Sequence, residues 1–171
     1  MHLGRFNSTE STYPAGAILK TAIIIYESKY GNTEQVAQEI AAGIEEAGKI
    51  SCTLSKPKDL NPAEVSKYDA ILFGCPVHMN RATRGIRGFI KKVGKAGVKG
   101  KTGALFETYM GAHNGRAIES MKAVVRNKVP GLTLVSEGLS AEVMEMKGPL
   151  HETEALTARD FGRNLGKKLL K

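Results

Sequence analysis

The sequence predicts an α/β domain: a three-layer sandwich in which a five-stranded parallel sheet of order 2-1-3-4-5 carries helices on both faces. Three observations support this fold class. Short, almost wholly apolar runs alternate with segments whose apolar residues recur every three or four positions. Strands that alternate with helices imply right-handed crossovers and a mostly parallel sheet. The chain has 171 residues, enough for the core of one domain, and shows no internal repeat.

Five segments have the composition of strands. Residues 21–26 form a β-branched run without polar alternation, as expected for a strand that is buried on both faces. Residues 69–74 are again almost wholly apolar. The remaining strands are expected at residues 50–54, 102–109 and 132–135. The strand order then places the first strand between the second and the third.

Helical periodicity predicts four helices. Three of them are expected at residues 32–48, 114–129 and 152–170. The fourth follows residue 80 and should turn four apolar side chains inward, namely Ile86, Phe89, Ile90 and Val93. Between the second and third strands the helical pattern is weak or missing, so that crossover should be irregular.

The N-terminal segment and the cysteines bear on location. Residues 1–17 lack the apolar centre of a secretory signal, so we expect a poorly ordered extension or expression remnant over residues 1–19 and one domain over residues 20–171. No apolar run approaches the roughly 18 residues needed to span a bilayer. Cys52 and Cys75 are too few and too far apart for a disulfide framework or a metal site. The expected location is a reducing cytoplasm.

Positive charge is concentrated in one segment. The formal net charge is +8, and from Arg81 to Lys101 there are eight Lys or Arg residues and no acid. Such a patch could meet nucleic acid, a membrane surface or an acidic protein, or it could be a solvated helix face. Within it four residues recur at helical spacing beside the apolar face; we call them the basic stripe, formed by Arg84, Arg87, Lys91 and Lys95.

The loop after the first strand has the composition of an anion site. In an open parallel sheet, ligands bind beyond the carboxyl ends of the strands, where the strand order reverses. The segment Ser28-Lys29-Tyr30-Gly31-Asn32-Thr33 lies there and leads into a helix, whose first amides are unpaired donors at the positive end of the helix dipole. The alternative is an ordinary helix cap at Asn32 or Thr33.

Two other phosphate-binding motifs are excluded. Gly100-Lys101-Thr102 is followed by a strand rather than preceded by one, and the position five before Gly100 is Lys95 where a nucleotide-binding P-loop needs glycine. The dinucleotide pattern G-x-G-x-x-G is absent after the first strand.

Three segments, taken in order, resemble the flavodoxin family, whose sheet has the strand order predicted above. Residues 24–37 look like the flavodoxin signature, with an apolar strand followed by Ser28, Gly31, Thr33 and a helix alanine. Residues 69–76 resemble the family's third strand and second flavin loop. Residues 106–111 resemble the third loop, most closely that of the flavodoxin domains of A-type flavoproteins. The resemblance runs from about Lys20 to the C-terminus.

The resemblance implies an FMN site made by three loops. Its phosphate would be held in the first loop by Ser28, Lys29, Tyr30, Gly31, Asn32 and Thr33. One side of the flavin ring would contact the second loop, at Pro76, Val77, His78, Met79 and Asn80. The other side would contact the third, at Thr108, Tyr109, Met110 and Gly111, with His113 nearby. The chain has no Trp, so we expect Tyr109, or else His113, to supply the aromatic contact. His78 and His113 lack the spacing of a metal pair.

The resemblance implies an electron carrier that uses non-covalent FMN to pass electrons between redox proteins. We expect an acidic partner, such as a ferredoxin, to dock at the basic stripe with electrostatic steering. One alternative is an NAD(P)H:quinone oxidoreductase of the WrbA-like kind, although that group's long insertion after the fourth strand has no clear counterpart here. Another is a binding module without flavin whose basic stripe contacts nucleic acid. No nucleic-acid motif accompanies the stripe, so we expect neither a nucleic-acid nor a membrane partner.

Overall fold

A computed structural model describes residues 19–171 of the chain, so the prediction for residues 1–17 lies outside the described residues. Its strands are β1 (Lys20–Tyr26), β2 (Ile50–Ser55), β3 (Ala70–Pro76), β4 (Lys101–Tyr109), β5 (Leu132–Leu134) and β6 (Leu139–Glu142). Its helices are α1 (Asn32–Glu46), α2 (Arg84–Ala96), α3 (Arg116–Lys128) and α4 (Glu154–Leu170), with 3-10 helices η1 (Pro57–Asp59) and η2 (Pro62–Lys67).

The sheet confirms the predicted strand order. Its strands lie in the order β2-β1-β3-β4-β5, and each neighbouring pair is parallel. The sequence analysis missed β6, which also pairs in parallel with β4. Leu134 pairs with Gly103, and Leu139 pairs with Phe106. The four residues that separate Leu134 from Leu139 therefore span only two residues of β4. The chain therefore leaves the sheet edge, turns at Gly138, where φ is 106°, and returns as β6.

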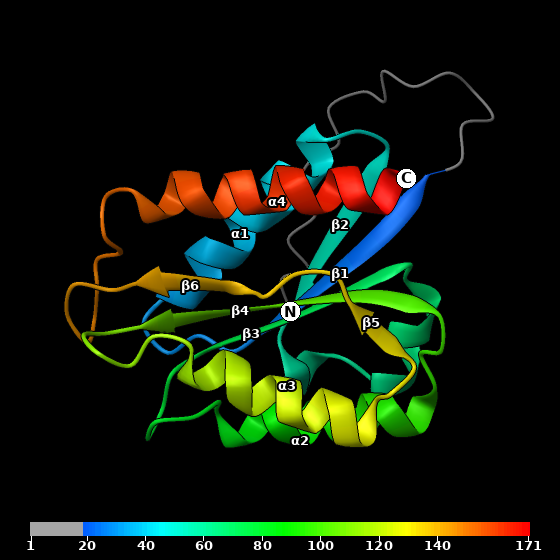
Figure 1. Cartoon of the computed structure of the whole chain (residues 1–171), viewed down its shortest axis with the longest axis horizontal. Coiled ribbons are helices and arrows are strands. Elements are labelled where there is room, and N and C mark those ends of the chain that lie inside the picture. The colour runs from blue at the N-terminus through cyan, green and yellow to red at the C-terminus, as the bar shows by residue number, and fades with distance from the viewer. Residues whose placement is uncertain (1–18) are drawn as a thin grey trace.

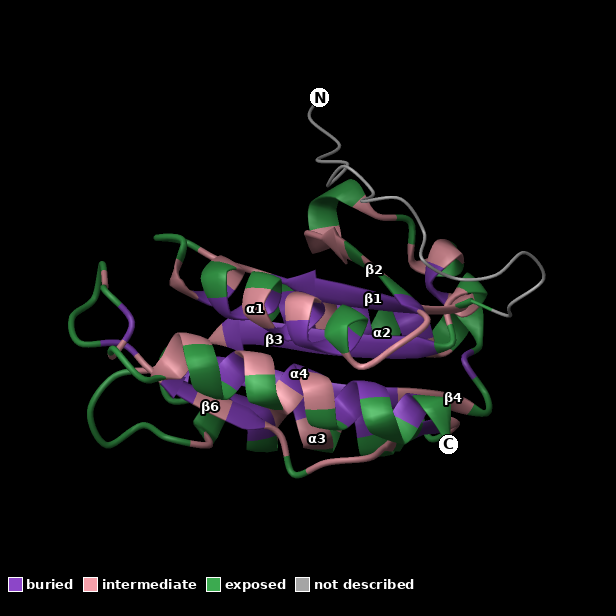
Figure 2. Ribbon diagram, turned by 90° about the horizontal axis from the view of Figure 1, so that it is seen from above, coloured by how far each residue is buried: buried purple, intermediate pink, exposed green. Residues whose placement is uncertain are grey.

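Helices cover both faces of the sheet (Figure 1). Helices α1 and α4 pack on one face, and α2 and α3 on the other. Successive residues of β1 point to opposite faces, so Ile24 joins the core under α1 and α4 while Ile25 joins the core under α2 and α3. Because both faces are covered, the central strands are buried (Figure 2), which explains their unbroken apolar sequences.

Two glycines allow α1 and α4 to approach closely. A Cβ atom at Gly43 would lie 2.0 Å from the carbonyl oxygen of Arg159, and one at Gly162 would lie 2.2 Å from that of Ile40. Any side chain at either position would overlap the backbone of the facing helix. Glycine is thus required here by contact rather than by backbone conformation.

The crossover between β2 and β3 is irregular, as predicted. Prolines start both short helices, η1 at Pro57 and η2 at Pro62, and neither helix covers the length of the sheet. Cys52 on β2 and Cys75 on β3 are both free and are separated by β1. Among residues 19–171, no helix has the length and apolar character needed to cross a membrane.

Candidate functional site

The turn between β1 and α1 presents unpaired backbone donors. Gly31 precedes the helix with φ 91°, and the Ser28 hydroxyl accepts hydrogen bonds from the amides of Gly31 (3.1 Å) and Glu34 (3.2 Å). The alternative of a side-chain cap at Asn32 or Thr33 is wrong, because α1 begins at Asn32 and Gly31 is the capping residue. Within the described residues, the amides of Asn32 and Thr33 donate to no acceptor. They lie at the positive end of a 15-residue helix, which is the arrangement that binds anions.

Hydrogen bonds join the three predicted loops at the carboxyl edge of the sheet. The hydroxyls of Thr33 and Thr108 are 2.8 Å apart, and both residues are buried. The amide of Val77 donates to the carbonyl of Thr108 at 2.8 Å. The first, second and third loops therefore meet at Thr108, the penultimate residue of β4.

The second loop is a tight turn. His78 and Arg81 form an antiparallel bridge, and the two residues between them, Met79 and Asn80, have φ of 49° and 64°. Positive φ at both central residues is the geometry of a type I′ turn. This turn leaves the Met79 side chain 79% exposed at the tip of the loop. The loop thus offers Val77 and His78 to the site, while Met79 and Asn80 lie beyond it.

A buried carboxylate fixes the third loop. Glu107 has no exposed surface and accepts hydrogen bonds from the amide of Gly115, from the amide of Ile118 (2.9 Å) and from the Ser140 hydroxyl (2.9 Å). The two amides belong to the start of α3, whose own capping residue, Gly115, has no side chain. Glu107 therefore replaces the missing cap and ties the loop between β4 and α3 to β6.

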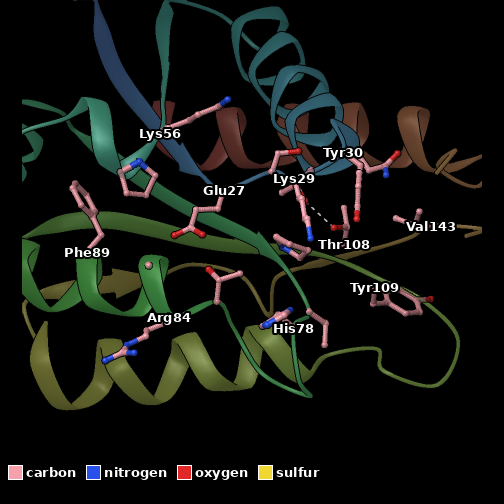
Figure 3. Close-up of a pocket in the computed structure, with 18 of the residues that line it drawn as sticks. Glu27, Lys29, Tyr30, Lys56, His78, Arg84, Phe89, Thr108, Tyr109 and Val143 are labelled. Carbon is pink, nitrogen blue, oxygen red and sulfur yellow. Dashed lines mark hydrogen bonds between the residues drawn. The ribbon is translucent and has the colours of Figure 1, made fainter. Parts of the chain in front are cut away.

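The loops enclose a cavity of 1110 Å³ (Figure 3). Of the predicted site residues, the structure brings eleven together in its lining: Ser28, Lys29, Tyr30, Asn32, Thr33, Pro76, Val77, His78, Thr108, Tyr109 and Met110. Five predicted residues do not line it: Gly31, Met79, Asn80, Gly111 and His113. Two of these are glycines that shape turns, and Met79 and Asn80 form the tip of the second loop. The His113 ring is 3.4 Å from the Asn80 amide oxygen, outside the cavity.

The cavity also has lining residues that the sequence analysis missed. Some follow β1 and β2, and others cap α2 or belong to it: Glu27, Lys56, Pro57, Lys58, Thr83, Gly85, Gly88, Phe89 and Lys92. Others follow β6: Val143, Glu145 and Met146. Arg84 lines the cavity too, and it is the one member of the basic stripe that does so. The second-strand loop could have been anticipated from the strand order, but β6 was not predicted at all.

Charges in the cavity are mainly positive. Five cationic side chains and two carboxylates, Glu27 and Glu145, are among its lining residues. Burial, followed by the nearby carboxylate of Glu142, raises the pKa of the Tyr109 hydroxyl. Tyr109 therefore stays a neutral aromatic side chain at physiological pH. Among residues 19–171, no group of three or more metal-binding side chains is found.

Comparisons with known proteins identify the family of this chain. A family model described as a flavodoxin domain matches residues 23–140. The chain is 26% identical to a flavodoxin of Clostridium saccharobutylicum over 152 residues, which are 85% of this chain and 95% of that one. Its fold is similar to a flavodoxin from the domain Archaea, with a TM-score of 0.76 and 21% identity over 88% of this chain and 99% of that one. It is similar also to the flavodiiron core of Flv1 from Synechocystis sp. PCC6803, with a TM-score of 0.72 and 21% identity, over 88% of this chain but 36% of that one.

Fold and site together define a flavin-binding α/β domain, and the chain belongs to the flavodoxin family. It is a flavodoxin-type electron carrier whose cofactor is FMN. The residues present fit that cofactor. The unpaired amides of Asn32 and Thr33 suit a phosphate, and Val77, Tyr109 and Met110 offer apolar contacts to a ring. FMN, when bound, supplies the redox chemistry, since it exchanges electrons singly or in pairs.

Proposed function

We propose that the turn from Ser28 to Thr33 holds the phosphate of FMN. The observation that carries this proposal is the pair of unpaired amides at Asn32 and Thr33, which open on the same cavity as the second and third loops. The Ser28 hydroxyl supports the turn by accepting two amide hydrogen bonds. Lys29 and Tyr30 extend it toward solvent, with the Lys29 ammonium 5.3 Å from the centre of the Tyr30 ring.

The flavin ring is proposed to lie between the second and third loops. Pro76, Val77 and His78 would contact one side, and Thr108, Tyr109 and Met110 the other. Tyr109 is our choice for the aromatic contact, because it lines the cavity whereas His113 does not. Gly31, Met79, Asn80, Gly111 and His113 would then shape the loops and the outer rim rather than form the walls. These residues bind, orient and partly shield the ring from water.

The phosphate seat is tested by comparing FMN with riboflavin. FMN should bind more than about tenfold tighter to the wild-type chain, because charge-assisted hydrogen bonds contribute about 1.5–3 kcal/mol each. Asn32→Asp places a carboxylate at the seat and should remove this preference while riboflavin affinity changes little. Asn61→Asp is the control, because Asn61 caps η2 with an oxygen that aspartate also has. Equal affinity of the wild-type chain for the two flavins would contradict the proposed seat.

The partner is proposed to be an acidic redox protein that docks at the basic stripe. Arg84, Lys91 and Lys95 are exposed, while Arg87 is half-buried and its Nε donates to the Ala82 carbonyl at 3.2 Å. The stripe begins at Arg84 on the cavity wall and runs along α2 away from it. Opposite charges would steer such a partner to the flavin edge. The proposed location is the cytoplasm, consistent with two free cysteines.

The docking proposal is tested with a ferredoxin as the reductant. Its rate of electron transfer should fall as ionic strength rises, and Lys91→Glu should slow it at low salt. Lys167→Glu on α4 is the control, since α4 covers the opposite face of the sheet. A rate that is indifferent to salt, or equal slowing by both variants, would contradict docking at the stripe.

A further inference from the structure

The cavity extends well beyond the three flavin loops. Figure 3 shows Tyr109 and Val143 at one end and Phe89 and Lys56 at the other, with Glu27 between them. The second end lies between the loop after β2 and the first turns of α2. We call it the basic groove and define it by Lys56, Lys58, Arg84, Gly88, Phe89 and Lys92. None of these residues belongs to the predicted flavin site.

Cations line the basic groove from two sides. Lys56 and Lys58 come from the segment that enters η1, and Arg84 and Lys92 come from α2. Within residues 19–171, none of these four side chains forms an ion pair. Glu27, between the two ends of the cavity, is the nearest carboxylate in the lining and leaves most of this charge uncompensated. Cations that line one groove without a nearby counter-charge make its potential positive, so an anion that enters the groove would be attracted.

The groove is open because the crossover after β2 lacks a full helix and because α2 carries a glycine there. The crossover from β2 to β3 consists of short 3-10 helices, so no full helix lies beside α2 there. Gly88 faces the resulting space, and a Cβ atom built at this position meets nothing within 4 Å. Glycine within a helix costs about 1 kcal/mol relative to alanine, and no contact or backbone conformation requires it here. Phe89, which is 5% exposed, and Pro57 supply apolar surface in the lining.

We propose that the basic groove is a second small-molecule site, which binds a phosphate compound beside the flavin. Four cations on two walls suit a group with several negative oxygens, whereas a single carboxylate would leave most of them unpaired. The apolar surface of Phe89 and Pro57 suits an organic part next to the phosphate. The ligand class is therefore a small organic phosphate with more than one negative charge, or the free anion itself.

This inference rests on the proposed placement of FMN at the other end of the cavity. The flavin phosphate has its own seat at Asn32 and Thr33, with unpaired amides and a helix N-terminus, and does not need the groove. A ligand in the groove would share the cavity with the flavin, at the Glu27 side. It would thus reach the cofactor by a route separate from the outer face of the basic stripe.

The test is isothermal titration calorimetry on the FMN-loaded protein, with ADP and inorganic pyrophosphate as probes at low ionic strength. ADP should bind with one site per chain. Lys92→Gln should weaken it by about tenfold or more, since a charge-assisted hydrogen bond is lost. Lys91→Gln is the matched control, because Lys91 is exposed on the same helix but does not line the cavity. Tighter binding of ADP than of pyrophosphate would support an organic phosphate, and equal binding would support the free anion.

Gly88 gives a second, independent test. Gly88→Leu should fill the groove and abolish ADP binding, while Gly88→Ala should keep it; both variants should retain the flavin spectrum. Failure of both probes to bind at millimolar concentration would overturn the inference, as would binding that Lys92→Gln and Gly88→Leu leave unchanged. Release of FMN by ADP would place both ligands in one site and overturn it too, although the proposed electron-carrier function would stand.

Discussion

Glycine has opposite effects in the two helical layers. Between α1 and α4, Gly43 and Gly162 bring two backbones into contact, and charged side chains are paired across the interface: Arg159 with Glu39, and Arg163 with Glu46. Beside α2, Gly88 faces open space and the cations of the basic groove have no partner among the described residues. In the layer of α1 and α4, the two backbones touch and these charges are paired. In the layer of α2 and α3, there is open space at Gly88, and the nearby cations form no ion pair within residues 19–171. The difference indicates that, apart from the flavin loops, the layer of α2 and α3 is the one suited to bind another molecule.

The largest effect on stability should follow from forcing α1 and α4 apart. Gly162→Val should destabilise the fold by about 3 kcal/mol or more, because its side chain would overlap the carbonyl of Ile40 and force the helices apart. Gly88→Ala should instead stabilise it by about 0.5–1 kcal/mol, since alanine favours the helix and meets nothing. Urea unfolding of both variants measures the contrast. Equal destabilisation would show that the two glycines do not differ in role.

A smaller loss of stability is expected when the buried carboxylate of Glu107 is replaced. Glu107→Gln should cost about 2–3 kcal/mol, because the amides of Gly115 and Ile118 donate to different carboxylate oxygens and the NH2 group that replaces one of them cannot accept a hydrogen bond. Chemical denaturation followed by the flavin signal and by circular dichroism would measure it. Glu119→Gln is the control: its salt bridge to Lys122 is exposed on the Glu119 side and should contribute under about 0.5 kcal/mol. Similar losses in both variants would argue against Glu107 as the cap of α3.

The thiols of the two cores should weaken the fold at alkaline pH. Burial raises the pKa of Cys75, in the core under α2 and α3, to about 12 from 9.0, and burial also raises the pKa of Cys52 on the other side. Above pH 9.0 the unfolded chain loses these protons while the native chain keeps them, so stability falls as pH rises, by about 1.4 kcal/mol per pH unit and per thiol. Urea unfolding at several pH values measures the slope. Cys75→Ala should make it shallower; an unchanged slope would contradict this origin.

The smallest effect on stability is expected when a charge pair between α1 and α4 is broken. Arg163→Gln should cost much less than Glu107→Gln, although Nε of Arg163 lies 2.6 Å from the Glu46 carboxylate, because both side chains are more than a third exposed. The loss should shrink further in high salt. Thermal unfolding at low and high ionic strength would measure it. A loss as large as that of Gly162→Val would mean that the pairing, rather than the glycine contact, holds α4 on α1.

The sequence predicted the elements whose signal is local. Unbroken apolar runs located β1 and β3, and helical periodicity located α1 and α2, because strands and helices buried on a sheet must carry these patterns. It missed β6, whose four residues, Leu139–Glu142, alternate between buried and half-buried at a sheet edge and give only a weak signal. The same holds for the cavity: composition and position predicted that the turn from Ser28 to Thr33 is a phosphate site, but the contributions of Val143 and Glu145 to the lining depend on the missed strand.

By itself, the sequence predicted the alternation of strands and helices, a candidate phosphate turn after β1 and the basic stripe, because each depends on neighbouring residues or on their spacing; the strand order followed from the predicted fold class and is confirmed. Only the tertiary structure decided which predicted residues face the cavity. The type I′ turn carries Met79 and Asn80 outward, and Glu107 anchors the loop that presents Tyr109. It also decided that Lys56 and Lys92, 36 positions apart, line one groove. Such proximity arises from packing across the sheet, and no local pattern encodes it.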